Sequence, residues 1–155
     1  MKPKVYELRS KFELGSLPKI ADFIEKNITR LGCKDRQVIH DVLLAVDEAS
    51  SNLIKHSKAK LKKDYFVIQL HCPTPTCIQT KIIDFTEPFS FEAHPILTPS
   101  LSVEEQLKHG WGIGLLKTIT ENATYCTFKT KNILTFFKYF NPQGDPHEHS
   151  RTKSK

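Results

Sequence analysis

The residues of this chain best suited to chemistry are a carboxylate and an amide, Glu48 and Asn52, which stand four positions apart. The surrounding run has helical periodicity, and helical residues four apart share a face, so both side chains are expected to project together. An amide oxygen is a neutral ligand suited to Mg²⁺, and a nearby carboxylate can accept a proton from a hydroxyl or water. The pattern E-x-x-x-N is common, and it is equally compatible with the exposed side of an ordinary amphipathic helix.

A second candidate is the glycine run Gly110-Trp111-Gly112-Ile113-Gly114, which directly precedes another helical segment. The first backbone N–H groups of a helix lack partners within the helix and, with the positive end of its dipole, attract anions. Glycines also let the backbone approach a phosphate closely. A helix start that needs close packing would explain the run as well. It is not a Walker loop, because no Gly-Lys-Ser/Thr follows, and no strand leads into it as in a Rossmann fingerprint.

Hydrophobic periodicity predicts the elements that must position these residues. Ser16 is expected to cap the first helix, with Pro18 in its first turn and Gly32 at its end, and Asp35 to begin the second. Tight turns are expected at 73–75 and 131–132. The predicted strands are 4–12, 65–72, 77–84, 123–129 and 133–140, and the predicted helices are 17–31, 35–54 and 111–122.

This order of elements, with hairpins between neighbouring strands, predicts an α/β two-layer sandwich whose sheet is mixed or antiparallel and whose helices pack on one face. Residues 86–109 form a long proline-bearing stretch without a clear element, which is typical of a lid or binding loop. We expect residues 1–140 to form one domain and residues 141–155 to be a polar, disordered tail.

Composition points to a cytoplasmic protein. The chain of 155 residues has 39% hydrophobic and 26% charged residues, as an ordinary globular domain does. No apolar run approaches the roughly 20 residues of a membrane helix, and the N-terminal residues lack a secretory signal. The four cysteines are scattered, and the spacing of Cys72 and Cys77 fits a zinc pair poorly, so we interpret them as free buried thiols.

The net charge is +6, and five lysines fall between Lys55 and Lys63. Such a run could attract nucleic acid or an acidic partner. Cations also suit the negative end of a helix dipole, and no aromatic residues interleave with the lysines for base stacking. We therefore favour a solvated helix end, and nucleic acid is the weakest of the partner hypotheses.

In combination, these motifs resemble the Bergerat-fold (GHKL) ATP-binding superfamily, and most closely its RsbW-like anti-sigma-factor serine/threonine kinases. Residues 44–56 read L-A-V-D-E-A-S-S-N-L-I-K-H, against the family pattern L-A-V-x-E-A-x-x-N-x-x-x-H. Asp84 follows a buried strand, and the glycine run ends in Leu115, as a Gly-x-Gly-Leu-type helix start requires. The likeness extends from about residue 4 to residue 140.

The resemblance implies a role for each motif. Asn52 would hold Mg²⁺ between the phosphates, Glu48 would be the general base toward a serine hydroxyl, and Asp84 would bind the adenine amino group. The loop 95–109 would be the ATP lid, and His56 matches a family position whose implied role is only structural. The residues implied to contact the nucleotide are Asn52, Asp84, Thr86, Gly110, Gly112, Ile113, Gly114 and Leu115.

One position departs from the family pattern. The family has Asp-x-Gly after the second hairpin strand, whereas this chain has Asp84-Phe85-Thr86; Pro88-Phe89 then matches again. A threonine adds a Cβ atom and disfavours positive φ at the place where the backbone passes under the adenine. The substitution therefore puts the affinity for adenine in question.

Two main hypotheses follow. The first is an ATP-dependent kinase that sequesters a sigma factor and phosphorylates an anti-sigma-factor antagonist, with homodimerisation implied by the resemblance. Retention of Glu48 favours it. The second is a binding module of the same fold that is catalytically weak or inactive, with or without nucleotide, which Thr86 and the basic run favour. Titration with ATP or ADP distinguishes the two, because absent nucleotide binding leaves only the second.

Overall fold

The computed structural model describes residues 2–56, 63–94, 96 and 111–143. Most of the lysine run (57–62), most of the long loop (95 and 97–110, including Gly110) and the tail from 144 onward lie outside the described residues. The sequence-based expectations for the lid and for a disordered tail therefore concern parts of the chain that are not described further.

The sheet has five strands in the order β1-β2-β3-β5-β4, and each described pair of neighbours is antiparallel. Of the two arrangements expected from the sequence, mixed or antiparallel, the sheet is thus antiparallel. The pairs β2–β3 and β4–β5 are simple hairpins. The strands are β1 (Val5–Lys11), β2 (Tyr65–Thr74), β3 (Cys77–Asp84), β4 (Glu121–Phe128) and β5 (Lys131–Tyr139).

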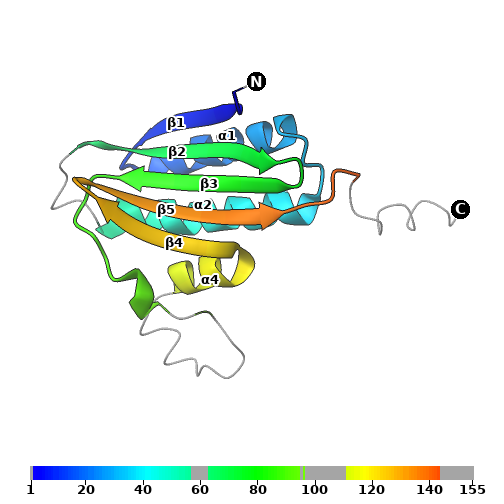
Figure 1. Cartoon of the computed structure of the whole chain (residues 1–155). Coiled ribbons are helices and arrows are strands. Elements are labelled where there is room, and N and C mark those ends of the chain that lie inside the picture. Colours follow the sequence, from blue (N-terminus) through cyan, green and yellow to red (C-terminus); the bar gives the residue numbers. More distant parts are fainter. Residues whose placement is uncertain (1, 57–62, 95, 97–110, 144–155) are drawn as a thin grey trace, which may run out of the picture.

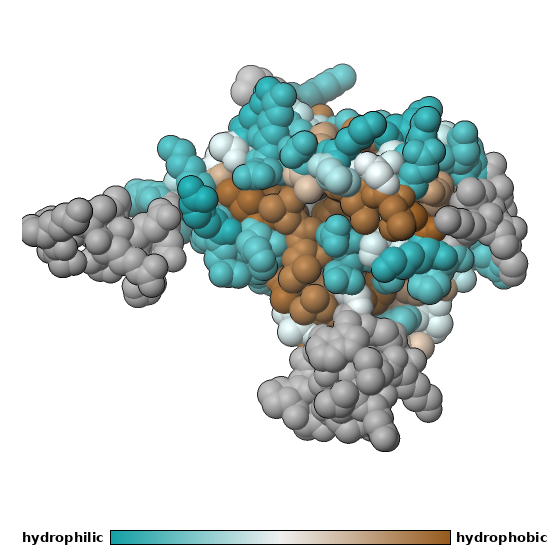
Figure 2. Space-filling model, turned by 180° about the vertical axis from the view of Figure 1, so that it is seen from behind, coloured by the Kyte–Doolittle hydropathy of each residue, from teal (hydrophilic) through white to brown (hydrophobic). Residues whose placement is uncertain are grey.

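In the described part of the chain, three α-helices cover one face of this sheet (Figure 1). Helix α2 (Arg36–His56) packs between α1 (Leu17–Arg30) and α4 (Trp111–Ile119), and α4 lies beside the edge strand β4. Short 3₁₀ turns, η1 (Leu14–Ser16) and η2 (Phe91–Ala93), complete the described elements. From the helix side, hydrophobic residues form a band between hydrophilic ones (Figure 2). The fold is the two-layer α/β sandwich predicted from the sequence.

Local signals account for the helix boundaries, with one correction. The Asp35 side chain caps α2, since its Oδ1 accepts the N–H groups of Gln37 (3.0 Å) and Val38 (3.3 Å). Gly32 has φ +98° and ends α1, while Pro18 occupies its first turn. Ser16 was expected to cap α1 but makes no capping hydrogen bond, because η1 already runs into the helix and holds Ser16 in helical geometry.

The core forms between α2 and the inner face of the sheet. Strand register aligns Ile68 with Ile82 and Ile82 with Leu134, so these side chains make one row across three strands. Val42 and Val46 of α2 pack over the strands, and both are almost fully buried. The same register sets Asp84 beside Asn132, at the end of the sheet nearest the C-terminus of α2. A polar pair thus closes one end of an apolar layer.

The region around β4 differs from the sequence-based boundaries. Helix α4 ends at Ile119 rather than 122, where the Thr120 hydroxyl donates to Leu116 O at 2.6 Å. Asn122 has φ 51° at a bulge, so β4 already begins at Glu121. The last hairpin turns at 129–130, with φ 56° at Lys129, and not at 131–132. Asn122 tolerates its positive φ because asparagine is among the residues that adopt left-handed geometry most readily.

Two further expectations concern the cysteines and membrane-spanning helices. The four cysteines are free thiols, as expected, but only Cys33 and Cys77 are buried; Cys72 is half-buried, and Cys126 is exposed on the edge strand β4. Burial raises the pKa of Cys33 to about 11, which keeps this thiol protonated and unreactive. In the part of the chain that the structure describes, no helix is long and apolar enough to span a membrane.

Candidate functional site

One cavity of about 450 Å³ collects most of the residues singled out in the sequence. It lies between the C-terminal half of α2, the first turn of α4 and the ends of β3 and β5, so both layers of the fold contribute walls. The lining residues are Glu48, Ala49, Ser51, Asn52, Leu53, Lys55, His56, Ile82, Asp84, Thr86, Glu87, Phe89, His94, Gly112, Ile113, Tyr125 and Leu134.

The wall made by α2 and α4 depends on Gly112. A Cβ atom added at this position would come within 2.8 Å of Glu48 Oε2 and 2.9 Å of Asn52 Nδ2. Its φ is not positive, so a glycine is needed here for space and not for an unusual backbone conformation. Any larger residue would displace the carboxylate or the amide. The missing side chain lets the first turn of α4 contact the chemical groups of α2.

This contact places a helix start against an acid and an amide. Gly112 and Ile113 belong to the first turn of α4, where backbone N–H groups have no acceptor within the helix. The half-buried side chains of Glu48 and Asn52 form no hydrogen bond or ion pair in the described part of the chain. Their polar atoms are also not sealed from solvent. This end of the cavity therefore offers donors and acceptors to a polar ligand.

The opposite end is built around Asp84, which is 4% exposed at the end of β3. Its Oδ1 accepts three hydrogen bonds: from Thr86 N (3.0 Å), Thr86 Oγ1 (2.7 Å) and Asn132 Nδ2 (2.9 Å). The Asn132 amide also donates to Thr86 O at 2.9 Å, and its oxygen accepts the Thr127 hydroxyl at 2.9 Å. Among the described residues nothing bonds Oδ2 of Asp84, which is left for a ligand that donates a hydrogen bond.

Thr86 occupies the position where the family pattern has glycine, and the structure shows how it is accommodated. Its φ is not positive, so the backbone conformation that would penalise a threonine is not adopted. The side chain is buried and its hydroxyl is fixed on Asp84, so it points to the carboxylate and completes the local turn. Thr86 also lines the cavity. It is part of the scaffold that orients Asp84.

A cluster of rings makes a third wall. Phe89 and Tyr125 lie 4.5 Å apart between centroids, and the Phe89 N–H donates to the Tyr125 hydroxyl at 3.4 Å. Lys117 of α4 holds the 3₁₀ turn η2, since its Nζ donates to Phe91 O (2.6 Å) and His94 O (2.5 Å). Burial raises the pKa of Tyr125 to about 12 and lowers the pKa of Lys117. The wall is an apolar surface against which a planar group could pack.

The remaining charges bear on which ligand could bind. Lys55 and His56 line the cavity from the last turn of α2, where Lys55 adds positive charge beside Asn52. In the described residues no group of three or more His, Cys, Asp or Glu side chains could hold a metal ion. A divalent ion in this cavity would therefore need ligands from the bound molecule as well as from Asn52. Mg²⁺ commonly binds in this way, through one or two protein groups, waters and phosphate oxygens.

The sequence-predicted site residues separate into three groups. Glu48, Asn52, Asp84, Thr86, Gly112 and Ile113 all line the one cavity. Gly114 is buried in α4 and Leu115 is half-buried, and neither lines it. Gly110 lies outside the described residues.

Several lining residues were not predicted. Lys55 could have been found, because it follows Asn52 by three positions on the same helix. Tyr125, and the partner of Asp84, Asn132, carry no local signal, since only the antiparallel register of β3, β4 and β5 brings them to the site.

The sequence matches the model of the histidine kinase-like ATPase domain over residues 11–138, which include every described wall of the cavity. The chain belongs to this family. The antiparallel sheet covered by helices on one face is consistent with the fold of this family. A search of curated proteins finds no significant match.

Among solved structures, the ATPase domain is similar to the RsbU and RsbW domains of Rv1364c from Mycobacterium tuberculosis. The TM-score is 0.63 at 12% sequence identity, and the match covers 88% of this chain. This likeness establishes a common fold. The match spans only 32% of that protein, which is about a third of its length.

Proposed function

We propose that this ATPase domain binds ATP with Mg²⁺ in the cavity and transfers the terminal phosphoryl group to a serine or threonine of a protein partner. The observation that carries the proposal is the contact of Gly112 with Glu48 and Asn52, in the cavity whose far end holds Asp84. The cavity thus has a candidate general base (Glu48) and an anion site (the start of α4) at one end, and a hydrogen-bond acceptor (Asp84) at the other.

The Asp84 end suits the adenine. Oδ1 is occupied by Thr86 and Asn132, so only Oδ2 remains to accept a hydrogen bond from an exocyclic amino group. Ile82, Leu134 and the Phe89–Tyr125 pair supply apolar surface on which a purine can pack. Guanine presents a carbonyl where adenine presents its amino group, so the carboxylate favours adenine.

The α2–α4 end suits the phosphates. Gly112 and Ile113 line the cavity from the first turn of α4, where free backbone N–H groups attract anions, and Lys55 adds positive charge. Asn52 offers a neutral oxygen to a divalent ion that already binds the phosphates. When bound, Mg²⁺ would neutralise charge on the phosphates and help orient them.

Glu48 is placed to take the proton during transfer. An acceptor hydroxyl attacks the terminal phosphorus, the bond from phosphorus to the bridging oxygen breaks, and ADP leaves. The hydroxyl proton passes to the Glu48 carboxylate, which has no competing hydrogen bond in the described residues. Gly112 keeps the carboxylate in reach of this end of the cavity.

The protein partners are proposed as a sigma factor, which the domain would sequester, and an anti-sigma-factor antagonist, which it would phosphorylate. The support is the match of residues 44–56 to the RsbW-like helix pattern and the fold shared with about a third of the chain that holds the RsbU and RsbW domains. A cytoplasmic location and a homodimer belong to the same proposal.

Calorimetric titration of the purified chain with Mg-ATP, Mg-ADP and Mg-GTP tests nucleotide binding. We expect saturable binding of both adenine nucleotides and at least about tenfold weaker binding of Mg-GTP. Incubation with Mg-ATP and a candidate antagonist that carries an acceptor serine then tests transfer, read by mass spectrometry. Binding without transfer, unchanged in Glu48→Gln, would leave a regulatory binding module. Failure to bind any nucleotide would remove the proposal altogether.

A further inference from the structure

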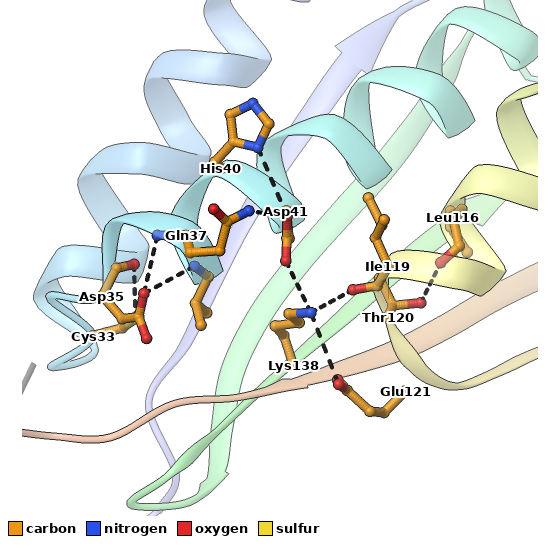
Figure 3. Close-up of polar contacts among 11 residues, drawn as sticks. Cys33, Asp35, Gln37, His40, Asp41, Leu116, Ile119, Thr120, Glu121 and Lys138 are labelled. Atoms are coloured by element: carbon orange, nitrogen blue, oxygen red, sulfur yellow. Dashed lines mark hydrogen bonds and ion pairs between the residues drawn. The ribbon is translucent and has the colours of Figure 1, made fainter. Parts of the chain in front are cut away.

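Both ends of helix α4 rest on α2, but by different means. The first turn reaches α2 through the bare Cα of Gly112, where no side chain can fasten it. The last turn is fastened by a charged side chain from β5, Lys138 (Figure 3). Helix α4 has nine residues and is thus only about 13 Å long, so a displacement at one end is felt at the other.

Lys138 joins three elements at one atom. Its Nζ donates to Ile119 O, the last carbonyl of α4, at 2.5 Å and lies 2.9 Å from Asp41 Oδ2 of α2. Glu121 Oε1 at the start of β4 lies 3.8 Å away. The side chains of Lys138 and Asp41 are 15% and 14% exposed. An ion pair so little exposed to solvent resists screening and fixes the separation of its partners.

Asp41 is itself held in place. Its Oδ1 accepts a hydrogen bond from Gln37 Nε2 at 2.8 Å, while Oδ2 faces Lys138 (Figure 3). Asp41 lies seven residues before Glu48 on the same continuous helix, two turns away and on the same side. Asp41, which anchors the C-terminal end of α4, and Glu48, which meets its N-terminal end, thus belong to the same helix, so their separation is fixed.

We propose that Lys138 is a positioning residue for the nucleotide site, acting through α4. By binding Ile119 O and Asp41 together, it sets where the first turn of α4 lies against Glu48 and Asn52. The inference rests on the proposed function, because it assigns that turn to the phosphates. Lys138 itself does not line the cavity.

The test separates positioning from general support of the fold by using two ligands. Mg-ATP engages both ends of the cavity, whereas adenosine lacks phosphates and engages only the Asp84 end. In Lys138→Met, we expect the Kd of Mg-ATP to rise at least about tenfold while the Kd of adenosine changes less than about twofold. In nucleotide-free protein, amide exchange in the 111–119 peptide should accelerate about tenfold or more.

Lys131→Met is the matched control, because this half-buried lysine lies on the same strand but its side chain points to the opposite face of the sheet. It should change none of the three readouts. Asp41→Asn keeps an acceptor for Lys138 and should shift each readout of Lys138→Met in the same direction by a smaller factor. This variant decides the matter if Lys138→Met does not fold.

The outcomes are distinguishable from those of the proposed function. Equal losses of Mg-ATP and adenosine affinity would mean that Lys138 supports the whole fold, and an unchanged Mg-ATP affinity would mean that it positions nothing; either overturns the inference. If the wild-type chain binds neither ligand, the proposed function has failed. Amide hydrogen exchange in residues 111–119 is then the remaining test of the role of Lys138, and an unchanged exchange rate in Lys138→Met overturns the inference.

Discussion

The two ends of the cavity are built on opposite principles. At the Asp84 end, hydrogen bonds from Thr86 and Asn132 converge on one carboxylate oxygen, and the residues are almost fully buried. At the α2–α4 end, Glu48 and Asn52 are half-buried and make no hydrogen bond in the described part of the chain. One end is finished before a ligand arrives, and the other is left open for one.

The difference fits the two parts of a nucleotide. A neutral, planar base is best selected by one fixed acceptor in an apolar setting, since a wrong partner then leaves a buried polar group unpaired. A polyphosphate with its metal ion brings its own charges and ligands, so the protein needs donors, a neutral oxygen and space. The comparison therefore predicts that changes at the open end impair transfer, whereas changes at the finished end impair base recognition and folding.

The largest effect is expected from Glu48→Gln. Removal of the proton acceptor should lower the rate of phosphoryl transfer by about 10³-fold, while the Kd of Mg-ATP stays within about threefold. Single-turnover transfer and calorimetry measure the two quantities. Asp47→Asn, an exposed neighbour on α2, is the control. A transfer rate within fivefold of wild type would assign the chemistry to another group.

Gly112→Ala tests the contact between the helices. The added methyl group would displace the ends of two flexible side chains, so the fold should survive while Mg-ATP affinity and transfer fall together by about a hundredfold. Gly15→Ala is the matched control, because nothing lies within 4 Å of the added atom. Full activity of Gly112→Ala with unchanged melting would show that the two helices need not touch.

At the finished end, Asp84→Asn should weaken Mg-ATP binding by about tenfold to a hundredfold, because an acceptor for the amino group is replaced in part by a donor. The preference for ATP over GTP should shrink along with it. Calorimetry with both nucleotides measures the change. Equal affinity of the variant and wild type for ATP would place the base elsewhere in the cavity.

Substitutions of Thr86 test whether this residue supports Asp84 or obstructs the binding of the base. Thr86→Val leaves the buried carboxylate one donor short and should cost about 1–2 kcal/mol of unfolding free energy, whereas Thr86→Ser should restore most of it. Urea denaturation measures both. Thr86→Gly, which recreates the family pattern, should alter Mg-ATP affinity by less than about threefold. A gain above tenfold would show that the threonine obstructs the base.

The smallest expected effect is on the pH dependence of the free energy of unfolding. Burial raises the pKa of Tyr125 from 10.0 to about 12, so as the pH rises the unfolded chain loses this proton first. The resulting stability is complete below pH 10 and is lost between pH 10 and pH 12. Cys33 contributes with the same sign between pH 9 and pH 11. Tyr125→Phe should flatten the fall above pH 10 in urea titrations; an unchanged slope would contradict the burial of this phenol.

The sequence predicts much of this because several signals are local. Asp35 and Gly32 mark helix ends by their own chemistry, and the spacing of Glu48 and Asn52 alone places both on one helix face. Asp84 at the end of a strand and Gly112 at the start of a helix can be recognised because they follow Glu48 and Asn52 in the order of the family motifs. The two-layer fold follows from the periodicity of its elements.

What the sequence does not predict depends on long-range register. Asn132 reaches Asp84 only because β5 pairs beside β3, and Tyr125 of β4 meets Phe89, which follows β3 in the chain. The accommodation of Thr86 follows from a backbone angle that the motif does not reveal. Lys138 in a strand has no pattern that points to the carbonyl of Ile119.

The proposed function requires that one cavity hold the base at Asp84 and the phosphates where α2 meets α4. A crystal structure with Mg²⁺ and a non-hydrolysable ATP analogue tests it most directly. We expect the adenine amino group within hydrogen-bond distance of Asp84 Oδ2, with the metal ion bound to Asn52 and the phosphates at the first turn of α4. An analogue bound in the reverse direction, or at another surface, would contradict it.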